Sequence, residues 1–142
     1  MQRALGLDVG DRRIGVALSD PVGITAQPLT VLQRQGGVKD VDTVCALAQQ
    51  HGVGVIVVGL PLTLRGERGL QAQKAVSFAD ALRQRIQVPV QLMDERLTTV
   101  QGERALLEGG LRRQHRKQVI DRVAAQLILQ SFLDVQANRT NS

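Results

Sequence analysis

The sequence predicts an α/β domain built on a mixed five-stranded sheet with helices on its faces. The chain has 142 residues, of which 43% are hydrophobic, so it is long enough for one domain with a real core. It opens with three strand-like segments in succession, which is typical of an antiparallel meander. Helical and strand-like patterns then alternate, as they do where helical crossovers join parallel strands.

The meander is predicted from aliphatic runs and turn residues. Residues 3–9 and 13–19 are aliphatic or β-branched, and the Gly-Asp-Arg sequence at 10–12 between them is turn chemistry for a hairpin. A third short strand is expected over residues 28–33. These three segments supply the antiparallel half of the sheet.

The later elements are predicted from helical spacing of apolar residues and from short aliphatic runs bounded by Gly or Pro. The expected helices cover residues 38–50, 70–86, 98–108 and 117–135, and the expected strands cover 55–58 and 88–93. No repeat or linker divides the chain, so residues 1–137 are expected to form a single domain and 138–142 a polar tail.

Composition restricts the partners and the compartment. Lys and Arg exceed Asp and Glu by 18 to 13, a net charge of +5 that favours an anionic partner such as RNA, DNA or acidic lipid. With two Phe, no Trp and no Tyr, base stacking on aromatic side chains is disfavoured. The single Cys45 excludes a disulfide framework and fits a reducing cytoplasm. No apolar run is long enough for a membrane span, so we expect a cytoplasmic protein without a membrane partner.

Asp8 is the first candidate for chemistry. Strand alternation places it on one face of residues 3–9 together with Ala4, Gly6 and Gly10, which have little or no side chain. A ligand could therefore approach its carboxylate closely. The alternative is that Asp8 begins the turn and caps a backbone N–H.

Two further acidic positions stand out. Asp121 lies within the apolar arc of the last expected helix, where a charge is costly unless it meets a cation or hydrogen-bond donors, or is stabilised by the helix N-terminus. Asp94 and Glu95 end a predicted strand, and because adjacent strand residues point to opposite faces, at most one of them can join Asp8. Three converging carboxylates suit a hard-cation site, such as two ions about 3.5–4 Å apart in phosphodiester hydrolysis.

A basic run precedes the last acidic candidate. Arg112, Arg113, Arg116 and Lys117 lie shortly before Asp121. A charge run is usually a solvated loop. Arginine also suits phosphate recognition through its planar fork, so these four residues are candidates for nucleic-acid binding.

Four segments resemble one known family. They are LGLDVGDRRIGVALSD (5–20), VVGLPLTLRGERG (57–69), DERLTT (94–99) and VIDRVAAQLILQSFLD (119–134), and they are similar to the YqgF family, also called RuvX, of bacterial RNase H-like proteins. The resemblance implies a ribonuclease H-like fold and a nuclease that matures the 5′ end of precursor 16S rRNA, or else one that resolves Holliday junctions.

The resemblance also implies roles for individual residues. Asp8, Glu95 and Asp121 match the acidic triad of the family, which would carry catalysis and hold the divalent ions. Arg13 and Arg96 lie in its motifs and are expected to contact nucleic acid.

The leading prediction is therefore a nuclease that uses Mg²⁺ or Mn²⁺, with two ions, and acts on structured RNA such as precursor rRNA. Branched DNA is the nearest alternative substrate, and it would require a dimer, whereas the sequence leaves monomer and dimer open. A phosphate-binding ATPase-like domain is a second class, because Asp8-x-Gly10-x-x-x-x-Gly15 resembles the phosphate-binding hairpin of actin and sugar kinases; the length argues against it. A non-catalytic RNA-binding module is the third.

Overall fold

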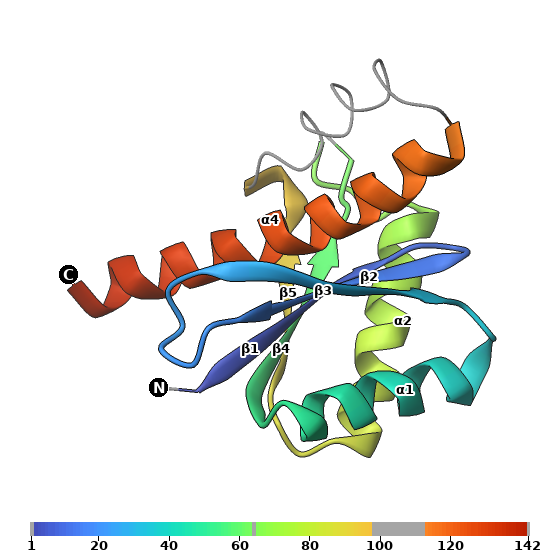
Figure 1. The fold of residues 1–142 in the computed structure, drawn as a ribbon. Helices are drawn as coiled ribbons and strands as arrows, with labels where there is room; N and C mark the ends of the chain where they lie inside the picture. Colours follow the sequence, from blue (N-terminus) through green and yellow to red (C-terminus); the bar gives the residue numbers. More distant parts are fainter. Residues whose placement is uncertain (1, 64, 98–112, 142) are drawn as a thin grey trace.

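The computed structural model describes residues 2–63, 65–97 and 113–141, with side chains throughout except at 97, 113–122 and 139–141. The elements follow one another along the chain as three strands, then alternating helices and strands, then a long helix (Figure 1). In order they are β1 (Arg3–Val9), β2 (Arg13–Ser19), β3 (Ala26–Gln33), α1 (Gly37–Gln50), β4 (Val53–Leu60), α2 (Leu70–Arg85), β5 (Val90–Asp94), the 3₁₀ turn η1 (Glu95–Leu97) and α4 (Arg113–Asn141).

The strands form one mixed sheet in the order β3-β2-β1-β4-β5. β1 pairs antiparallel with β2, and β2 antiparallel with β3. β4 lies parallel to β1, and β5 lies parallel to β4. The predicted architecture, an antiparallel meander followed by crossover strands, is confirmed.

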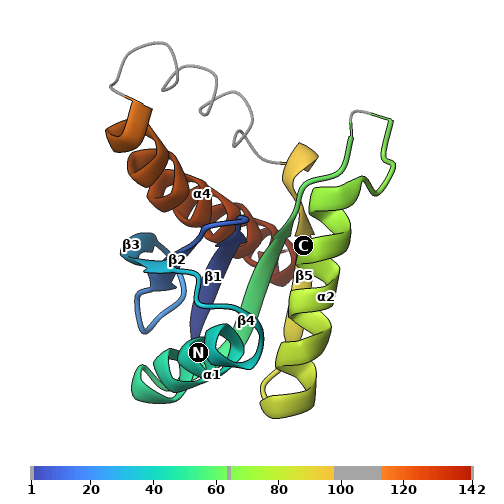
Figure 2. The same cartoon turned by 90° about the vertical axis from the view of Figure 1, so that its right-hand side faces the viewer.

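Helices cover both faces of the sheet (Figures 1 and 2). Leu5 and Leu7 of β1 pack with Val44 of α1 and Phe78 of α2 in one aliphatic core. On the other face Ala4 packs under α4 in a second core. The predicted alternation along β1 is therefore confirmed, with large side chains toward α1 and α2 and small ones toward α4.

Small residues let α4 lie very close to β1. A β-carbon placed on Gly6 would lie 2.7 Å from Cβ of Leu129 and 3.2 Å from the carbonyl oxygen of Ala125. Such a carbon has no room, so a side chain at this position would push the helix away from the sheet. Glycine at position 6 thus sets the distance between α4 and the strand that carries Asp8.

Two glutamines fix α4 along the other side of the sheet. Gln130 accepts a hydrogen bond from the Ala26 N–H through Oε1 (2.9 Å) and donates from Nε2 to the Ile24 carbonyl (2.9 Å). Gln126 donates from Nε2 to the Ala26 carbonyl (3.0 Å). These amides bond to the backbone at the start of the edge strand β3. They therefore fix the position of α4 along the sheet, in addition to its distance from the sheet.

Asp40 organises the start of α1. Its buried carboxylate accepts hydrogen bonds from the N–H groups of Gln35 and Gly36 and from Nε of Arg34 (3.0 Å). Burial raises the pKa of Asp40, but these donors outweigh burial and leave the pKa below its ordinary value. Arg34 also donates from Nη1 to the Gly10 carbonyl (2.9 Å), which ties the turn after β1 to this helix start.

The strand boundaries differ from expectation where glycines were interpreted as breaks. β4 covers Val53–Leu60 rather than 55–58, because Gly54 and Gly59 belong to the strand. A β-carbon on Gly59 would lie 2.5 Å from Ile128 Cδ1, so this glycine serves close packing and does not end the strand. β3 begins at Ala26 instead of residue 28, and β5 covers Val90–Asp94 instead of 88–93.

The last helix is longer than expected. α4 begins at Arg113 and not at residue 117, because Arg, Gln and Lys are good helix formers and need no apolar stripe to continue a helix. It runs to Asn141, so residues 138–141 of the expected tail are helical. The helix expected over 98–108 lies outside the described residues. Within the described part of the chain, no helix combines the length and the apolar character that a membrane crossing requires.

Candidate active site

Three parallel strands bring their carboxyl ends to one edge of the sheet. β1, β4 and β5 end at Val9, Leu60 and Asp94, and we call this the carboxyl edge. In α/β sheets, ligands bind at this edge because loops and helix starts converge there. Asp8 and Glu95, two of the predicted site residues, lie at it.

Asp8 is buried between two glycines. Only 7% of its surface is exposed, and it shares the α4 face of β1 with Ala4 and Gly6. Across β2 its partner is Gly15. On the other side Leu7 pairs with Val58, and continuing this register by one residue places Asp8 beside Gly59 of β4. Asp8 thus has a glycine beside it on both flanking strands.

Glu95 reaches the same face from the far side of β4. It is the first residue of η1, 1% exposed, and both carboxylate oxygens are buried. Its Oε2 lies 3.4 Å from a β-carbon placed on Gly59, and Ile128 of α4 touches the same point. Glu95 therefore packs on the α4 side of the sheet, as Asp8 does, and β4 with Gly59 lies between β1, which carries Asp8, and β5, which leads into Glu95.

Asp94 has a different set of contacts. Its carboxylate accepts hydrogen bonds from the backbone N–H, Nε and Nη2 of Arg96 at 2.8–3.2 Å. The hydrogen bonds from the Arg96 side chain hold the pKa of Asp94 below its ordinary value, and the same contact raises the pKa of Arg96. The two adjacent side chains thus differ in their surroundings. Glu95 packs on the α4 face of the sheet, whereas Asp94 forms an ion pair with Arg96.

Arg96 also supports the loop that follows β4. A β-carbon on Gly66 would lie 3.1 Å from Nη1 of Arg96, so the guanidinium lies directly against the loop backbone. The sequence placed Arg96 among the nucleic-acid contacts, and that remains a prediction. In the structure the guanidinium contacts the Asp94 carboxylate and the backbone at Gly66.

The remaining predicted residues are only partly described. Asp121 lies in α4, seven residues and so about two turns before Ile128, at nearly the same angular position on the helix. Its side chain, and those of Arg113, Arg116 and Lys117, lie outside the described part, as does Arg112 altogether. The basic run from Arg113 to Lys117 is helical and forms the start of α4. Arg13 begins β2 and is half-buried.

The chemistry of the described donors suits a hard cation. Two carboxylates buried on one face offer oxygen ligands, which Mg²⁺ and Mn²⁺ prefer. Among the side chains that the structure describes, no three His, Cys, Asp or Glu residues form a metal-binding group. A third ligand would have to come from outside that set, as the prediction for Asp121 requires.

Sequence reasoning missed the glycines that flank Asp8 on the neighbouring strands. It identified Gly6 and Gly10 beside Asp8 along β1 but gave no such role to Gly15 and Gly59. The available signal was a glycine within each of two otherwise aliphatic strands. Its meaning depends on strand register, which only the folded sheet supplies.

Comparisons with known sequences agree over nearly the whole chain. The profile of the family described as "RuvX: Holliday junction resolvase" matches residues 2–135. A protein of Pelotomaculum thermopropionicum is 51% identical over 135 residues, covering 94% of this chain and 88% of that protein. One of Desulforudis audaxviator is 47% identical over 140 residues, covering 99% of both. Each bears the name "Putative pre-16S rRNA nuclease".

Comparisons with solved structures show the same fold in distant proteins. Thermus thermophilus RuvC in complex with a Holliday junction substrate superposes with a TM-score of 0.59 at 16% identity, covering 96% of this chain and 97% of that one. The yeast mitochondrial Holliday junction resolvase gives a TM-score of 0.57 at 14% identity, covering 99% and 82%. At such identities the likeness concerns the fold, which is ribonuclease H-like.

Proposed function

The chain belongs to the RuvX family, and from this premise we propose that it is a divalent-metal-dependent nuclease that processes the 5′ end of precursor 16S rRNA. The observation that carries the proposal is the placement of Asp8 and Glu95. Both carboxylates are buried on the α4 face at the carboxyl edge, on either side of the strand that carries Gly59. We place the protein in the cytoplasm, the compartment that the single Cys45 favours.

The residues of this chain would hold the ions and the substrate in fixed positions. Asp8 and Glu95, with Asp121 as third carboxylate, would be the ligands of Mg²⁺ or Mn²⁺, two ions in our proposal. Bound there, the ions supply activation of water and charge stabilisation on the leaving oxygen. Gly59 lets Ile128 of α4 and the Glu95 carboxylate pack against β4 beside Asp8. The basic residues at the start of α4, with Arg13, would bind the adjacent backbone.

RNA is the substrate that the similar sequences favour. Relatives at about half identity carry a name that refers to precursor rRNA, and they span nearly the same length as this chain. Cleavage of four-way DNA junctions is the second candidate, supported by the description of the family and by the shared fold with junction resolvases. It would need two active sites in one assembly to cut paired strands.

A cleavage assay separates the candidates. The purified protein is incubated with a 5′-extended precursor 16S rRNA, an unrelated RNA of equal length, and a four-way DNA junction, with Mg²⁺, Mn²⁺ or a chelator. We expect metal-dependent removal of the 5′ extension. Cutting of the junction alone would favour the resolvase, whereas RNA binding without cleavage in any metal would leave a binding module and refute the nuclease.

A further inference from the structure

Several arginines at the carboxyl edge are exposed and have no carboxylate partner in the described part of the chain. They are Arg12 in the β1–β2 turn and Arg65 and Arg68 in the β4–α2 loop. Several other arginines do pair with carboxylates, as Arg34 does with Asp40, Arg85 with Asp42 and Arg96 with Asp94. We call Arg12, Arg65 and Arg68 the arginine rim. Its charges are available to an anionic partner.

The loop that carries Arg65 and Arg68 has a defined backbone. The Thr63 N–H donates to the Glu67 carbonyl (3.0 Å), and the Gly66 N–H donates to the Thr63 carbonyl (2.8 Å). The Glu67 N–H also donates to Oγ1 of Thr63 (3.0 Å). These bonds join Thr63 to Gly66 and Glu67, so the backbone that carries Arg65 is constrained and loses less conformational entropy on binding.

Arg96 docks this loop onto the turn that begins with Glu95. Gly66 has φ of +82°, a conformation that glycine adopts at little cost, and its α-carbon faces the Arg96 guanidinium. Arg96 is itself held by Asp94. The chain of contacts Asp94, Arg96, Gly66 therefore sets the position of the loop relative to the buried Glu95 carboxylate.

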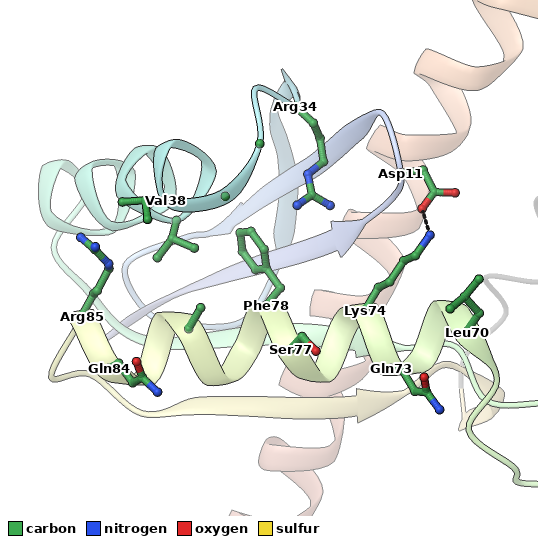
Figure 3. A pocket seen from close by; sticks show the side chains of 14 residues that line it. Asp11, Arg34, Val38, Leu70, Gln73, Lys74, Ser77, Phe78, Gln84 and Arg85 are labelled. Carbon is green, nitrogen blue, oxygen red and sulfur yellow. Dashed lines mark hydrogen bonds and ion pairs between the residues drawn. The ribbon is translucent and has the colours of Figure 1, made fainter.

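The β1–β2 turn is fixed to the same region by Asp11. Its carboxylate pairs with Nζ of Lys74 (2.6 Å) and accepts from Nε2 of Gln71 (3.2 Å), both near the start of α2. Figure 3 shows the Asp11–Lys74 contact at one end of a groove of about 950 Å³ between α1 and α2. Arg12 follows Asp11 directly, and Arg68 precedes Gln71 by three residues. Arg12 and Arg68 thus lie close in sequence to residues that join the β1–β2 turn to the start of α2.

We propose that the arginine rim is a second binding surface for the phosphodiester backbone of the RNA substrate, with Arg96 as the positioning residue of its loop. The inference rests on the proposed function. α4, which begins with the basic run, and the β4–α2 loop lie on opposite sides of the carboxyl edge (Figure 2). The RNA backbone would be gripped on both sides of Asp8 and Glu95. Bidentate hydrogen bonds from arginine to phosphate position the RNA strand but do not recognise its base sequence.

The test measures RNA binding without cleavage. A fluorescent 5′-extended precursor 16S rRNA fragment is titrated by anisotropy in chelator, over a range of salt, with the wild type and with Arg65→Gln/Arg68→Gln. The control, matched in charge, is Arg3→Gln/Arg85→Gln near the other ends of β1 and α2; it also breaks the Arg85–Asp42 ion pair. Melting curves check that both variants fold.

We expect the rim variant to bind about 5- to 8-fold more weakly at 0.1 M salt for each arginine–phosphate pair removed, and its salt slope to fall by about 0.7–0.9 per pair. The weakening should be similar for RNAs of unrelated sequence, and the control should stay close to wild type. Equal weakening in both variants, an unchanged salt slope, or an effect limited to one RNA sequence would each overturn the proposal.

A second pair of variants tests the position of the β4–α2 loop without changing the charge of the protein. Gly66→Ala places a methyl against Arg96, whereas Gly52→Ala strains another glycine of positive φ (+61°) that has open space around it. Gly66→Ala should weaken RNA binding and Gly52→Ala should not; equal affinities would refute the role of Arg96. Binding in chelator does not depend on hydrolysis. A negative cleavage assay and an unchanged RNA affinity of the rim variant are therefore distinct results.

Discussion

Gly59→Ala changes a position that lies against both a core side chain and a candidate catalytic carboxylate. The added β-carbon would lie 2.5 Å from Cδ1 and 3.2 Å from Cγ1 of Ile128, and 3.4 Å from Oε2 of Glu95. The first distance is a severe overlap, whereas the last is ordinary van der Waals contact. We therefore expect two separable effects, one on stability through Ile128 and one on cleavage through the position of the Glu95 carboxylate.

The stability effect follows from the burial of Ile128. This side chain is completely buried, so it cannot swing into solvent to admit the methyl. Overpacking a tight core costs about 1–3 kcal/mol, and for a domain of this size each kcal/mol lowers Tm by about 3–5 °C. Ile128→Val removes Cδ1, the atom that overlaps, at a cost of about 0.5–1.5 kcal/mol when made alone.

The assay is a double-mutant cycle with cleavage measured on every variant. Urea denaturation of wild type, Gly59→Ala, Ile128→Val and the double variant should give a favourable coupling of about 1 kcal/mol, because each substitution relieves the defect of the other. Cleavage should fall at least about tenfold in both variants that carry Gly59→Ala, since a small displacement at a reacting centre has a large effect on rate.

Two results would refute this reasoning. An additive cycle would show that the methyl group introduced at Gly59 and Ile128 Cδ1 do not compete for the same space. Recovery of cleavage together with stability in the double variant would show that Gly59 matters only for its packing against Ile128, and that its contact with Glu95 does not affect catalysis.

Three further predictions concern single carboxylates. Asp8→Asn should abolish metal-dependent cleavage in a nuclease assay while the melting curve stays cooperative; full activity would exclude Asp8 as a metal ligand. Glu95→Gln should reduce cleavage far more than Asp94→Asn, since Asp94 pairs with Arg96, and the reverse ranking would contradict the placement of Glu95 in the site. Asp40→Asn should cost about 1–3 kcal/mol of unfolding free energy near neutral pH. Because the folded-state pKa of Asp40 is lowered, its contribution is present above the ordinary value of 3.8 and is lost as the pH falls through the folded pKa, so denaturation curves of variant and wild type should converge in acid.

Sequence patterns predicted the parts of this fold that depend on local periodicity. The alternation in β1 correctly separated Leu5 and Leu7 from Ala4 and Gly6, because period-two patterning follows directly from strand geometry. The five strands and their mixed direction followed from the order of elements. What failed was the interpretation of Gly59, since a glycine that admits a helix and one that ends a strand look the same in one dimension.

The candidate site was predictable in its residue types but not in its surroundings. Asp8 was predicted as a site residue because its carboxylate lies among small residues. Strand alternation predicted that Asp94 and Glu95 point to opposite faces of the sheet. Nothing in the sequence indicated that Arg96, bonded to its near neighbour Asp94, would also lie against Gly66, because that second contact joins η1 to the β4–α2 loop through tertiary packing. The third carboxylate, Asp121, stays a prediction from the sequence.

The close contact between Gly6 and Leu129 has a consequence for the biosynthesis of the protein. It joins β1, the first strand of the sheet to be translated, with the last described helix, so the native sheet face stays uncovered until α4 has been made. Contacts so distant in sequence form late, because a long loop must close before they stabilise anything. A nascent chain therefore carries the Asp8 and Glu95 carboxylates well before it can assemble them beneath a helix. We therefore expect the site to be complete only after α4 has left the ribosome.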